Sequence, residues 1–485
     1  MIRLLVILLV SAGLTANRLP AFADEALPKQ AASALKRAVE FYHGKVAVHG
    51  GYVYRYSDDL AKREGEGKVE TEKVWVQPPG TPSVGMAYLE AYEFVGDEYL
   101  LKAARDAAEC LIQGQLRTGG WRESIEFDPN ERKKFAYRVE KERERQKNHT
   151  TFDDDKTQSA MRLLMRLDQT LKFKDEKLHE ASLFSLDSVV KAQFPNGGWG
   201  QGYDSFPNPA DYPVKPASYP ESWPRTYPGG KYWYFYTLND NAMADTVDAL
   251  LMAGKIYRAP KYRDAAIKGG EFLILAQMPE PQPAWAQQYD FEMHPCWARK
   301  FEPASITGGE SQGAIRILVR LFVETGDRKF LAPIPKALDY LERSRLPNGQ
   351  MARFYELQTN KPLYLTKTYE LTYDDSDLPT HYGFKLDGKL DQLRREYDGV
   401  AKLTEKQLAE RREPKPSRRT TSASLEAQVK KLIDALDDRG AWVEDGQLRY
   451  HGKSDPTRRV IDNQTFIRNI GTLSRYLAAV RGSSG

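Results

Sequence analysis

One sequence pattern recurs along this chain: an alanine-rich stretch with apolar residues at helical spacing, then a polar turn, then an aromatic residue. Residues 99–115 lead to Gly-Gly-Trp at 119–121, and residues 178–193 lead to Gly-Gly-Trp at 197–199. Further copies are 31–48 before Tyr52, 262–277 before Trp285, 330–345 before Phe354 and 425–438 before Trp442. The spacing of roughly 65 to 90 residues indicates helical hairpins with loops rather than solenoid repeats of about 34 to 47.

A second set of helices is predicted between these stretches. Apolar residues recur at helical spacing in 83–95, 154–170, 240–257, 309–325 and 462–480. Short breaks such as 96–97 and 326–327 separate each of them from the alanine-rich stretch that follows. Glycine suits such breaks because it accepts the left-handed conformation that ends a helix.

Alternating helices of two kinds predict an all-α fold, an (α/α) toroid of repeated helical hairpins with long rim loops. An open helical array is the second choice. We expect one such domain over residues 24–485, with a charged insertion at about 385–421 that forms a solvated helix and then a proline-containing linker at 413–417. Residues 206–236 hold seven prolines and are predicted to form an ordered loop over the rim. The site is expected where several Gly-Gly-Trp loops converge.

The first residues predict export. Arg3 precedes an apolar run at 4–16, and Ala21-Phe22-Ala23 fits the small-x-small pattern before a signal-peptidase cut. We therefore predict a signal peptide at 1–23 and a secreted or periplasmic protein without a membrane anchor after cleavage. An uncleaved anchor is the alternative.

The charge and the cysteine and histidine content argue against several classes of protein. The 485 residues include 71 Lys and Arg against 67 Asp and Glu, a net charge of +4, so no strongly basic field indicates a nucleic-acid binder. The only two cysteines, Cys110 and Cys296, cannot build a disulfide framework, and we expect free thiols, with one isolated bridge as the alternative. The seven histidines include no pair at zinc-ligand spacing.

Two predicted helices begin with clustered oxygen ligands. Asp153, Asp154 and Asp155 open one, and 239–241 opens the next helix of the same kind with Asp240 between two asparagines. Adjacent carboxylates are costly unless a divalent cation neutralises them, and the two starts could share one. The alternative is helix capping, since Asp accepts backbone N–H bonds at a helix start.

Two rim loops each carry an arginine, aromatic residues and a glutamate. One contains Arg299 and Glu302, and the other contains Arg353 and Glu356. They predict two guanidinium groups aimed at one acidic ligand, because arginine binds carboxylates with a bidentate fork. An arginine–glutamate surface pair is the alternative.

Six motifs in order resemble polysaccharide lyase family 10, the pectate lyases. They lie at 152–157, 197–201, 238–243, 285–289, 298–303 and 353–360. The resemblance implies an α/α toroid and the calcium-assisted β-elimination of polygalacturonate, an acidic polysaccharide. It also implies Arg299 as the base that takes the proton at C5, Asp153 as a catalytic carboxylate, and Asp240 and Asp154 as calcium ligands. The substrate-binding residues implied are Arg353, Trp199, Gln288, Tyr289 and Lys361.

The sequence departs from the family at two places. The family shows an Asp-Asn-Gly-Ala type of helix start, where this chain has Asp153, Asp154, Asp155 and Lys156, so the extra charges can alter the cation site. The family's second arginine near a Gly-Arg-Asp turn is missing from 361–373, which puts part of the carboxylate clamp in question.

Two other functions remain open at this point. A glycoside hydrolase would use Asp153 and Asp240 as acid and base, about 6.5–9.5 Å apart if it inverts configuration. A non-catalytic carbohydrate-binding protein would use the rim aromatics. We expect a monomer in each case, with no nucleic-acid partner.

Overall fold

The computed structural model describes residues 26–413 and 420–483. The predicted signal peptide at 1–23 and most of the predicted linker at 413–417 lie outside the described residues. Among the residues that are described, no helix has both the length and the apolar character needed to cross a membrane.

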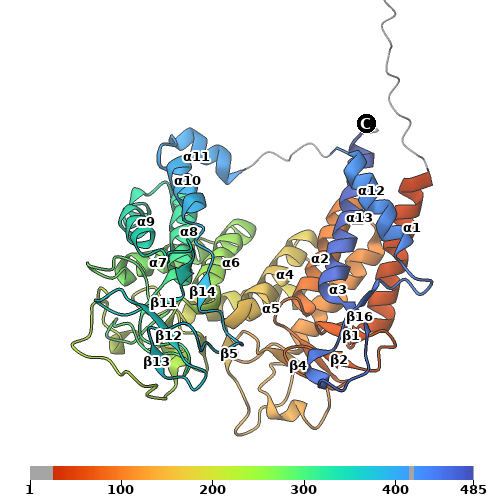
Figure 1. The fold of residues 1–485 in the computed structure, drawn as a ribbon. Coiled ribbons are helices and arrows are strands. Elements are labelled where there is room, and N and C mark those ends of the chain that lie inside the picture. The colour runs from red at the N-terminus through yellow and green to blue at the C-terminus, as the bar shows by residue number, and fades with distance from the viewer. Residues whose placement is uncertain (1–25, 414–419, 484–485) are drawn as a thin grey trace, which may run out of the picture.

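Helical hairpins follow one another along a curved array (Figure 1). The inner helices pack in the order α13–α2–α4–α6–α8, and the outer helices α3, α5, α7 and α9 each pack on the inner helix that precedes them. The inner helices are α2 (Thr81–Val95), α4 (Lys156–Thr170), α6 (Ala242–Tyr257), α8 (Gly308–Thr325) and α13 (Asn463–Ser483). The outer helices are α1 (Ala26–Phe41), α3 (Glu98–Gln113), α5 (Glu176–Lys191), α7 (Pro260–Ala276) and α9 (Ile334–Arg343). The predicted all-α fold of toroid type, built from repeated hairpins, is confirmed.

The two Gly-Gly-Trp turns lie between an outer helix and the next inner helix, the first between α3 and α4 and the second between α5 and α6. Gly197 has φ +91°, and a Cβ atom there would lie 2.0 Å from the carbonyl oxygen of Lys268, so only glycine lets this turn approach the next outer helix. Trp199 is 2% exposed and its indole N–H donates to the Val189 carbonyl at 2.9 Å. Trp121, Trp285 and Trp442 make the same kind of bond to the helices that precede them. These tryptophans belong to the core, whereas Arg122 and Gln201, which follow the two Gly-Gly-Trp turns, line one shared cavity, so the two loops converge as predicted.

Short sheets line the end of the array at which the inner helices begin, which we call the rim. β5 (Thr150–Thr151) pairs with β6 (Gly202–Tyr203) before α4, and β7 (Tyr236–Thr237) pairs with β8 (Gln288–Tyr289) before α6. A four-stranded sheet has the order β13-β12-β11-β9, in which β9 (Ile306–Thr307) leads directly into α8, whereas β11 (Phe354–Tyr355), β12 (Pro362–Leu365) and β13 (Leu371–Thr372) follow α9 in the chain. A two-stranded sheet of β3 (Lys73–Trp75) and β4 (Ser124–Glu126) lies at the same end.

The proline-rich loop at 206–236 is tied to the rim. The Ala217 N–H donates to the Leu275 carbonyl at 2.7 Å, and the Trp297 indole N–H donates to the Pro224 carbonyl at 2.8 Å. Short 3₁₀ turns at Pro209–Asp211 and Tyr232–Tyr234 interrupt it, and it ends at the first residue of β7, Tyr236. The expectation of a non-helical loop anchored to the rim agrees with these contacts.

The charged segment 385–421 differs from its prediction. It begins in β14 (Lys385–Leu386), which pairs with β10 (Met351–Ala352), and continues into α10 (Leu390–Ala401) and α11 (Glu405–Arg412). Both helices pack on α8, and α10 also packs on α9. Leu390, Leu393 and Leu408 are buried there, so this segment extends the array instead of standing apart as a solvated helix.

The two ends of the described chain meet. β1 (Arg55–Ser57) pairs with β16 (Arg459–Asp462) in a sheet of order β15-β16-β1-β2, which also holds β2 (Arg63–Glu64) and β15 (Val443–Asp445). α13 packs between α1 and α2, and α12 (Ala423–Asp434) covers α1 and α13 (Figure 1). The rings of Tyr42 and Phe466 stack with centroids 3.7 Å apart.

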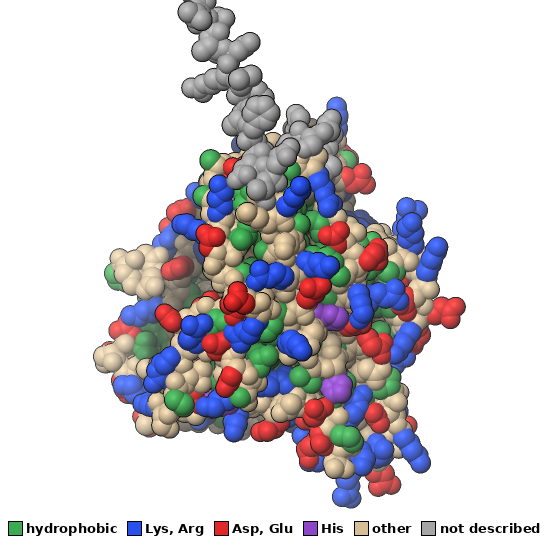
Figure 2. Space-filling view, turned by 90° about the vertical axis from the view of Figure 1, so that its right-hand side faces the viewer, with side chains coloured by type: hydrophobic (Ala, Val, Ile, Leu, Met, Phe, Trp, Pro, Cys, Tyr) green, Lys and Arg blue, Asp and Glu red, His purple; other side chains and the backbone are tan. Residues whose placement is uncertain are grey.

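Charge and cysteine expectations hold in the structure. Basic and acidic side chains are interspersed over the face drawn in Figure 2, which agrees with the nearly balanced composition. Cys110 and Cys296 are both free thiols, as predicted, and Cys110 is buried.

Candidate functional site

Two inner helices, α4 and α6, begin with the same unusual backbone. Each follows a short strand and a 3₁₀ turn, Asp153–Asp155 before α4 and Asn239–Asn241 before α6. Asp154 and Asp155 have φ 47° and 62°, and Asp240 and Asn241 have φ 49° and 58°. Asp and Asn are the non-glycine residues that best tolerate this left-handed region. Aspartate and asparagine therefore occupy the positions with left-handed backbone, and the two helix starts are structurally equivalent.

These helix starts lie against each other and form an acidic cluster. One carboxylate oxygen each from Asp153, Asp154 and Asp240 lies within 4.8 Å of the other two. Neither helix start has a side-chain cap, so the capping alternative for these aspartates is not supported. Asp155 turns away and pairs with Arg162. The two helix starts lie side by side, which is the arrangement that a shared cation requires.

Two cations contact the acidic cluster. The Lys156 Nζ atom is 2.7 Å from Asp153 Oδ2 and 3.6 Å from Asp154 Oδ2. The Arg299 guanidinium is 3.0 Å from Asp240 Oδ2, and it donates two further hydrogen bonds to Glu302 at 2.8 and 2.7 Å. The Glu302 side chain is 1% exposed, so this is a buried bidentate pair and not the surface pair of the alternative interpretation.

The protonation of the cluster is uneven. Burial would raise the pKa of Asp153, but the Lys156 ammonium and then Arg299 outweigh it and lower that pKa. Burial raises the pKa of Asp240 to about 7, and the charges of Asp153, Asp154 and Glu302 act in the same direction against Arg299. Burial and then the charge of Asp153 raise the pKa of Asp154. Asp153 is thus the carboxylate most strongly held in its charged form, whereas Asp154 and Asp240 bind a proton more readily than exposed aspartates do.

Arg299 is a firmly protonated cation in this arrangement. Burial alone would lower its pKa, but the hydrogen bonds and charges of Glu302, with the charge of Asp240, raise it above the ordinary value.

Arg353 reaches the same neighbourhood through one intermediate side chain. Its guanidinium carbon lies 4.4 Å from the centre of the Tyr382 ring, and the Tyr382 hydroxyl donates to Glu302 at 2.9 Å. Arg353 is also 3.7 Å from Glu310, and its Nε donates to the Gly383 carbonyl at 2.5 Å. The two arginine loops thus converge, although the second glutamate, Glu356, pairs with Arg225 instead of Arg353.

The donor set of the cluster fits a hard divalent cation. Carboxylate oxygens are the ligands that such ions prefer, and three of them are close together here. Gln77 and Asn239 donate to Asp154 and Asp240 at 3.2 and 2.7 Å, and their own carbonyl oxygens are buried without a partner. Buried oxygens without a protein partner beside carboxylates are suited to accept a bound water or to ligate an ion.

A cavity of about 440 Å³ adjoins the cluster. Asp153, Lys156 and Gln201 form one wall, and the other walls are Arg122, Glu123, His149, Thr151, Asp204, Tyr232, Trp233 and Tyr234. Basic side chains and aromatic rings in one polar cavity suit a charged sugar, because rings stack on sugar faces while cations pair with carboxylates.

Three predicted substrate-binding residues are corrected by the structure. Trp199, Gln288 and Tyr289 are 2%, 1% and 0% exposed. The Tyr289 hydroxyl donates to the Ala276 carbonyl at 2.6 Å, and Gln288 Nε2 donates to the Tyr232 carbonyl at 2.8 Å. Their polar atoms are used to hold the rim together and cannot reach a polymer.

Lys361 is exposed and lies elsewhere on the rim. Its Nζ atom is 5.1 Å from the centre of the Tyr373 ring, and the Tyr373 hydroxyl donates to Glu356 at 2.7 Å. A role in substrate binding stays a prediction for this residue.

Several side chains of the site were not predicted. Lys156, Glu302, Tyr232, Arg122 and Tyr382 hold or line it. Lys156 and Glu302 are inside motifs that the sequence had already singled out, so the signal for them was present. Arg122 directly follows the Gly-Gly-Trp turn at 119–121, and Tyr232 lies in the loop predicted to cover the rim, so both regions carried a signal, whereas no motif indicated Tyr382.

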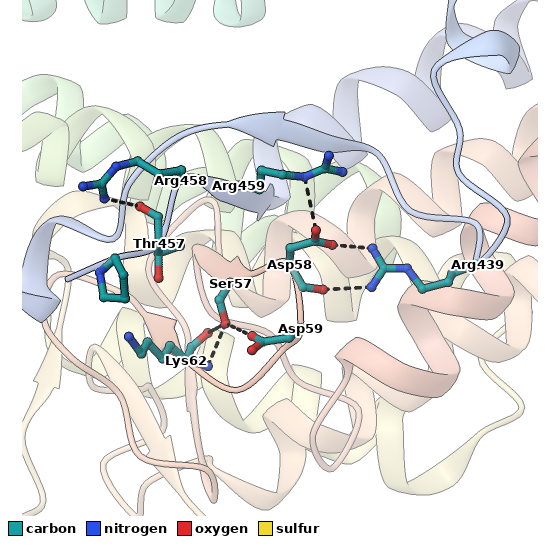
Figure 3. A pocket seen from close by; sticks show the side chains of 9 residues that line it. Ser57, Asp58, Asp59, Lys62, Arg439, Thr457, Arg458 and Arg459 are labelled. Carbon is teal, nitrogen blue, oxygen red and sulfur yellow. Dashed lines mark hydrogen bonds and ion pairs between the residues drawn. The ribbon is translucent and has the colours of Figure 1, made fainter.

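A second cavity, of about 540 Å³, lies by the sheet that joins the two ends of the chain (Figure 3). Arg439 and Arg459 line it, but both are paired with Asp58. Lys62 is likewise paired with Asp455 at 2.5 Å. Arg458 donates only to the backbone carbonyls of Asp455 and Thr457, and no cluster of carboxylates with the spacing of a metal site lies here among the described residues, so the acidic cluster remains the stronger candidate.

Comparison with known proteins agrees with this choice. Residues 115–321, which contain both helix starts and Arg299, match the family described as pectic acid lyase. This match confirms the resemblance predicted from the sequence, and it supports a polysaccharide lyase. No curated protein matches the chain.

Solved structures give weaker likenesses. The family 10 polysaccharide lyase from Cellvibrio cellulosa is 18% identical, with 61% of this chain and 92% of that chain covered and a TM-score of 0.46. A mutant of the Cellvibrio cellulosa enzyme in complex with trigalacturonic acid is 16% identical, with 66% and 98% covered and a TM-score of 0.47. Cellobiose 2-epimerase from Spirochaeta thermophila is 14% identical, with 96% and 99% covered and a TM-score of 0.43. With TM-scores below 0.5, these likenesses do not bear on the activity.

Proposed function

We propose that this protein is a secreted polysaccharide lyase that cleaves polygalacturonate by calcium-assisted β-elimination. The observation that supports this most strongly is the single cluster of Asp153, Asp154, Asp240 and Arg299, with Arg353 one side chain away. Carboxylates that can hold a cation and guanidiniums that can bind a uronate carboxylate are the groups that this chemistry requires.

The reaction begins at the carbon next to the uronate carboxylate. A base takes the C5 proton, the electron pair forms the C4–C5 double bond, and the bond from C4 to the glycosidic oxygen breaks. Negative charge builds up on the carboxylate as the proton leaves, so cations aimed at it lower the barrier. Asp153, Asp154 and Asp240 would hold calcium, which when bound would polarise that carboxylate.

We assign Arg299 as the base, in keeping with the motif that it occupies. Glu302 and Asp240 keep its guanidinium protonated, so this role requires alkaline pH and a loosening of these pairs when substrate binds. At lower pH the same guanidinium acts as a cation that neutralises the uronate carboxylate. Arg353 is then the second cation on the substrate, held in position by Tyr382.

The neighbouring cavity supports an acidic sugar as the substrate. Arg122 and Lys156 are its basic side chains, and Tyr232, Trp233 and Tyr234 are its aromatic ones. We propose that a galacturonate unit next to the cleaved bond occupies this cavity.

The geometry disfavours an inverting glycoside hydrolase. Carboxylate oxygens of Asp153 and Asp240 lie within 4.8 Å of each other, closer than the separation of about 6.5–9.5 Å that leaves room for an attacking water. A non-catalytic binding protein would not need a buried Arg299–Glu302 pair beside an acidic cluster.

The test is cleavage of polygalacturonate, followed by the absorbance of the unsaturated product. We expect activity in the wild type, loss with a chelator and recovery with calcium, and a fall of about 10²-fold or more in Arg299→Ala. Saturated products, or binding without turnover, would contradict the proposal. Full activity in Arg299→Ala would remove the assigned mechanism while leaving the reaction class intact.

A further inference from the structure

The ammonium group of Lys156 lies among the proposed calcium ligands. Lys156 is the first residue of α4, and its side chain is only 6% exposed. The ammonium contacts Asp153 at 2.7 Å and Asp154 at 3.6 Å, which are two of the three carboxylates in the cluster. An ammonium so placed neutralises the oxygens that a metal ion would coordinate.

The fold does not require a lysine at this position. The equivalent residue at the start of α6 is Ala242, and the preceding residues have nearly the same dihedral angles, φ 47° and ψ 41° for Asp154 against φ 49° and ψ 34° for Asp240. A cation in the first turn also opposes the helix dipole, which favours negative charge there. The backbone and the dipole therefore give no reason for Lys156, whereas the acidic cluster does.

We propose that Lys156 is a built-in cation that competes with the divalent ion at this site. The ammonium neutralises part of the negative charge of Asp153 and Asp154, so the site binds calcium weakly. It also holds the Asp153 side chain in position when no ion is bound. The inference rests on the proposed function only for the identity of the ion. It deepens that proposal by setting how strongly the site depends on calcium.

Repulsion supplies the physical reason. An ion held by Asp153 and Asp154 would lie within a few ångströms of the ammonium, in a part of the protein where water screens charge poorly. Either the ion binds weakly or the lysine moves aside, and both lower the affinity. Removal of the ammonium leaves the three carboxylates with Arg299 as the one cation that contacts them among the described residues, so their attraction for a divalent cation is stronger.

The test measures binding of calcium alone to the full-length protein by titration calorimetry, with no substrate present. We expect Lys156→Ala and Lys156→Met to bind calcium at least about tenfold more tightly than the wild type, and Lys156→Arg to stay close to it. Methionine keeps the apolar stem of the side chain, so it guards against misfolding of the alanine variant. Lys177→Ala is the matched control, because Lys177 lies in the first turn of α5 and pairs with Glu109 far from the cluster.

Thermal unfolding gives a second readout. We expect calcium to raise the melting temperature of Lys156→Met more than that of the wild type, since only the variant gains a tightly bound ion. Equal calcium affinity in the wild type and both neutral variants would overturn the inference. If the variants bind calcium more tightly but no form cleaves polygalacturonate, the inference stands and the proposed function falls. If polygalacturonate is cleaved but the variants bind calcium no more tightly than the wild type, the proposed function stands and the inference about Lys156 falls.

Discussion

The starts of α4 and α6 have nearly the same backbone but different charges. In α4 the residue after the left-handed pair is Lys156, which contacts two aspartates, whereas in α6 it is Ala242. The carboxylate of Asp240 instead takes its cation from Arg299, on a rim loop 59 residues later. One helix start therefore brings its own counter-ion, and the other depends on a loop.

Because of this difference, the pKa values of Asp153 and Asp240 shift in opposite directions. The nearby ammonium lowers the pKa of Asp153, whereas burial and neighbouring carboxylates raise the pKa of Asp240 to about 7. A carboxylate pushed in this direction gains most from an added cation. The α6 start is thus the one on which we expect an ion and a mobile arginine to have the greatest effect.

The largest effect is expected from Asp240→Asn. It removes the charge that links the cluster to Arg299, so we expect kcat/KM for polygalacturonate to fall about 10²- to 10³-fold and calcium affinity to weaken. Asp155→Asn is the matched control, because Asp155 lies in the equivalent turn but faces Arg162. If both variants lose activity equally, the difference between the two starts has no bearing on catalysis. Steady-state kinetics of the two proteins decides this.

Glu302→Gln should have the next largest effect. The neutral amide holds Arg299 less firmly and removes the charge that raises its pKa, so we expect kcat/KM to fall about tenfold. If Arg299 is the base, the limb of the pH–rate profile on which the rate rises with pH moves to lower pH, because that limb follows loss of the base's proton. A profile that keeps its shape and position would show that the proton is taken by another group.

Trp199→Phe tests the support beneath the α6 start. The Trp199 carbonyl accepts a hydrogen bond from Thr237 N–H at 2.9 Å, and its indole N–H donates to Val189. Loss of the indole bond should lower the free energy of unfolding by about 1–2 kcal/mol, with KM nearly unchanged. A large rise in KM with normal stability would restore Trp199 as a substrate contact. Chemical denaturation and kinetics measure the two quantities.

Asp245→Asn should give the smallest effect. Burial, and then the charge of Asp155, raises the pKa of Asp245 from its ordinary 3.8 to about 7. The folded state therefore holds this proton more tightly than the unfolded chain, and stability is lost as the pH rises from about 4 to 7. We expect the variant to melt about 1–3 °C above the wild type near pH 8 and at nearly the same temperature near pH 4.5. A higher melting temperature of the variant near pH 4.5 but not near pH 8 would contradict the predicted direction of the pH dependence.

Helical periodicity identified the hairpins well, because one apolar face per helix is a strong local signal. The same reasoning found Asp153, Asp240 and Arg299, since each belongs to a compact motif. It could not tell that Trp199, Gln288 and Tyr289 face the core, because aromatic and amide side chains occur both at sugar sites and in buried hydrogen bonds. The pairing of Lys156 with Asp153 depends on side-chain direction at a kinked helix start, which spacing does not encode.

Segment 385–421 was misjudged for a different reason. Its high charge indicated solvation, but Leu390, Leu393 and Leu408 are enough to attach α10 and α11 to the array. A few well-placed leucines can decide whether a polar helix packs, whatever its overall composition.

The insertion of α13 between α1 and α2 affects how the molecule is assembled. The apolar surfaces of α1 and α2 that face α13 have no cover until β16 and α13, residues 459–483, have been made. Contacts between such distant partners form slowly, because the long intervening loop must be closed first. A newly made chain should therefore stay open and vulnerable to proteases until its last helix docks, and removal of α13 should unfold the beginning of the protein rather than its end.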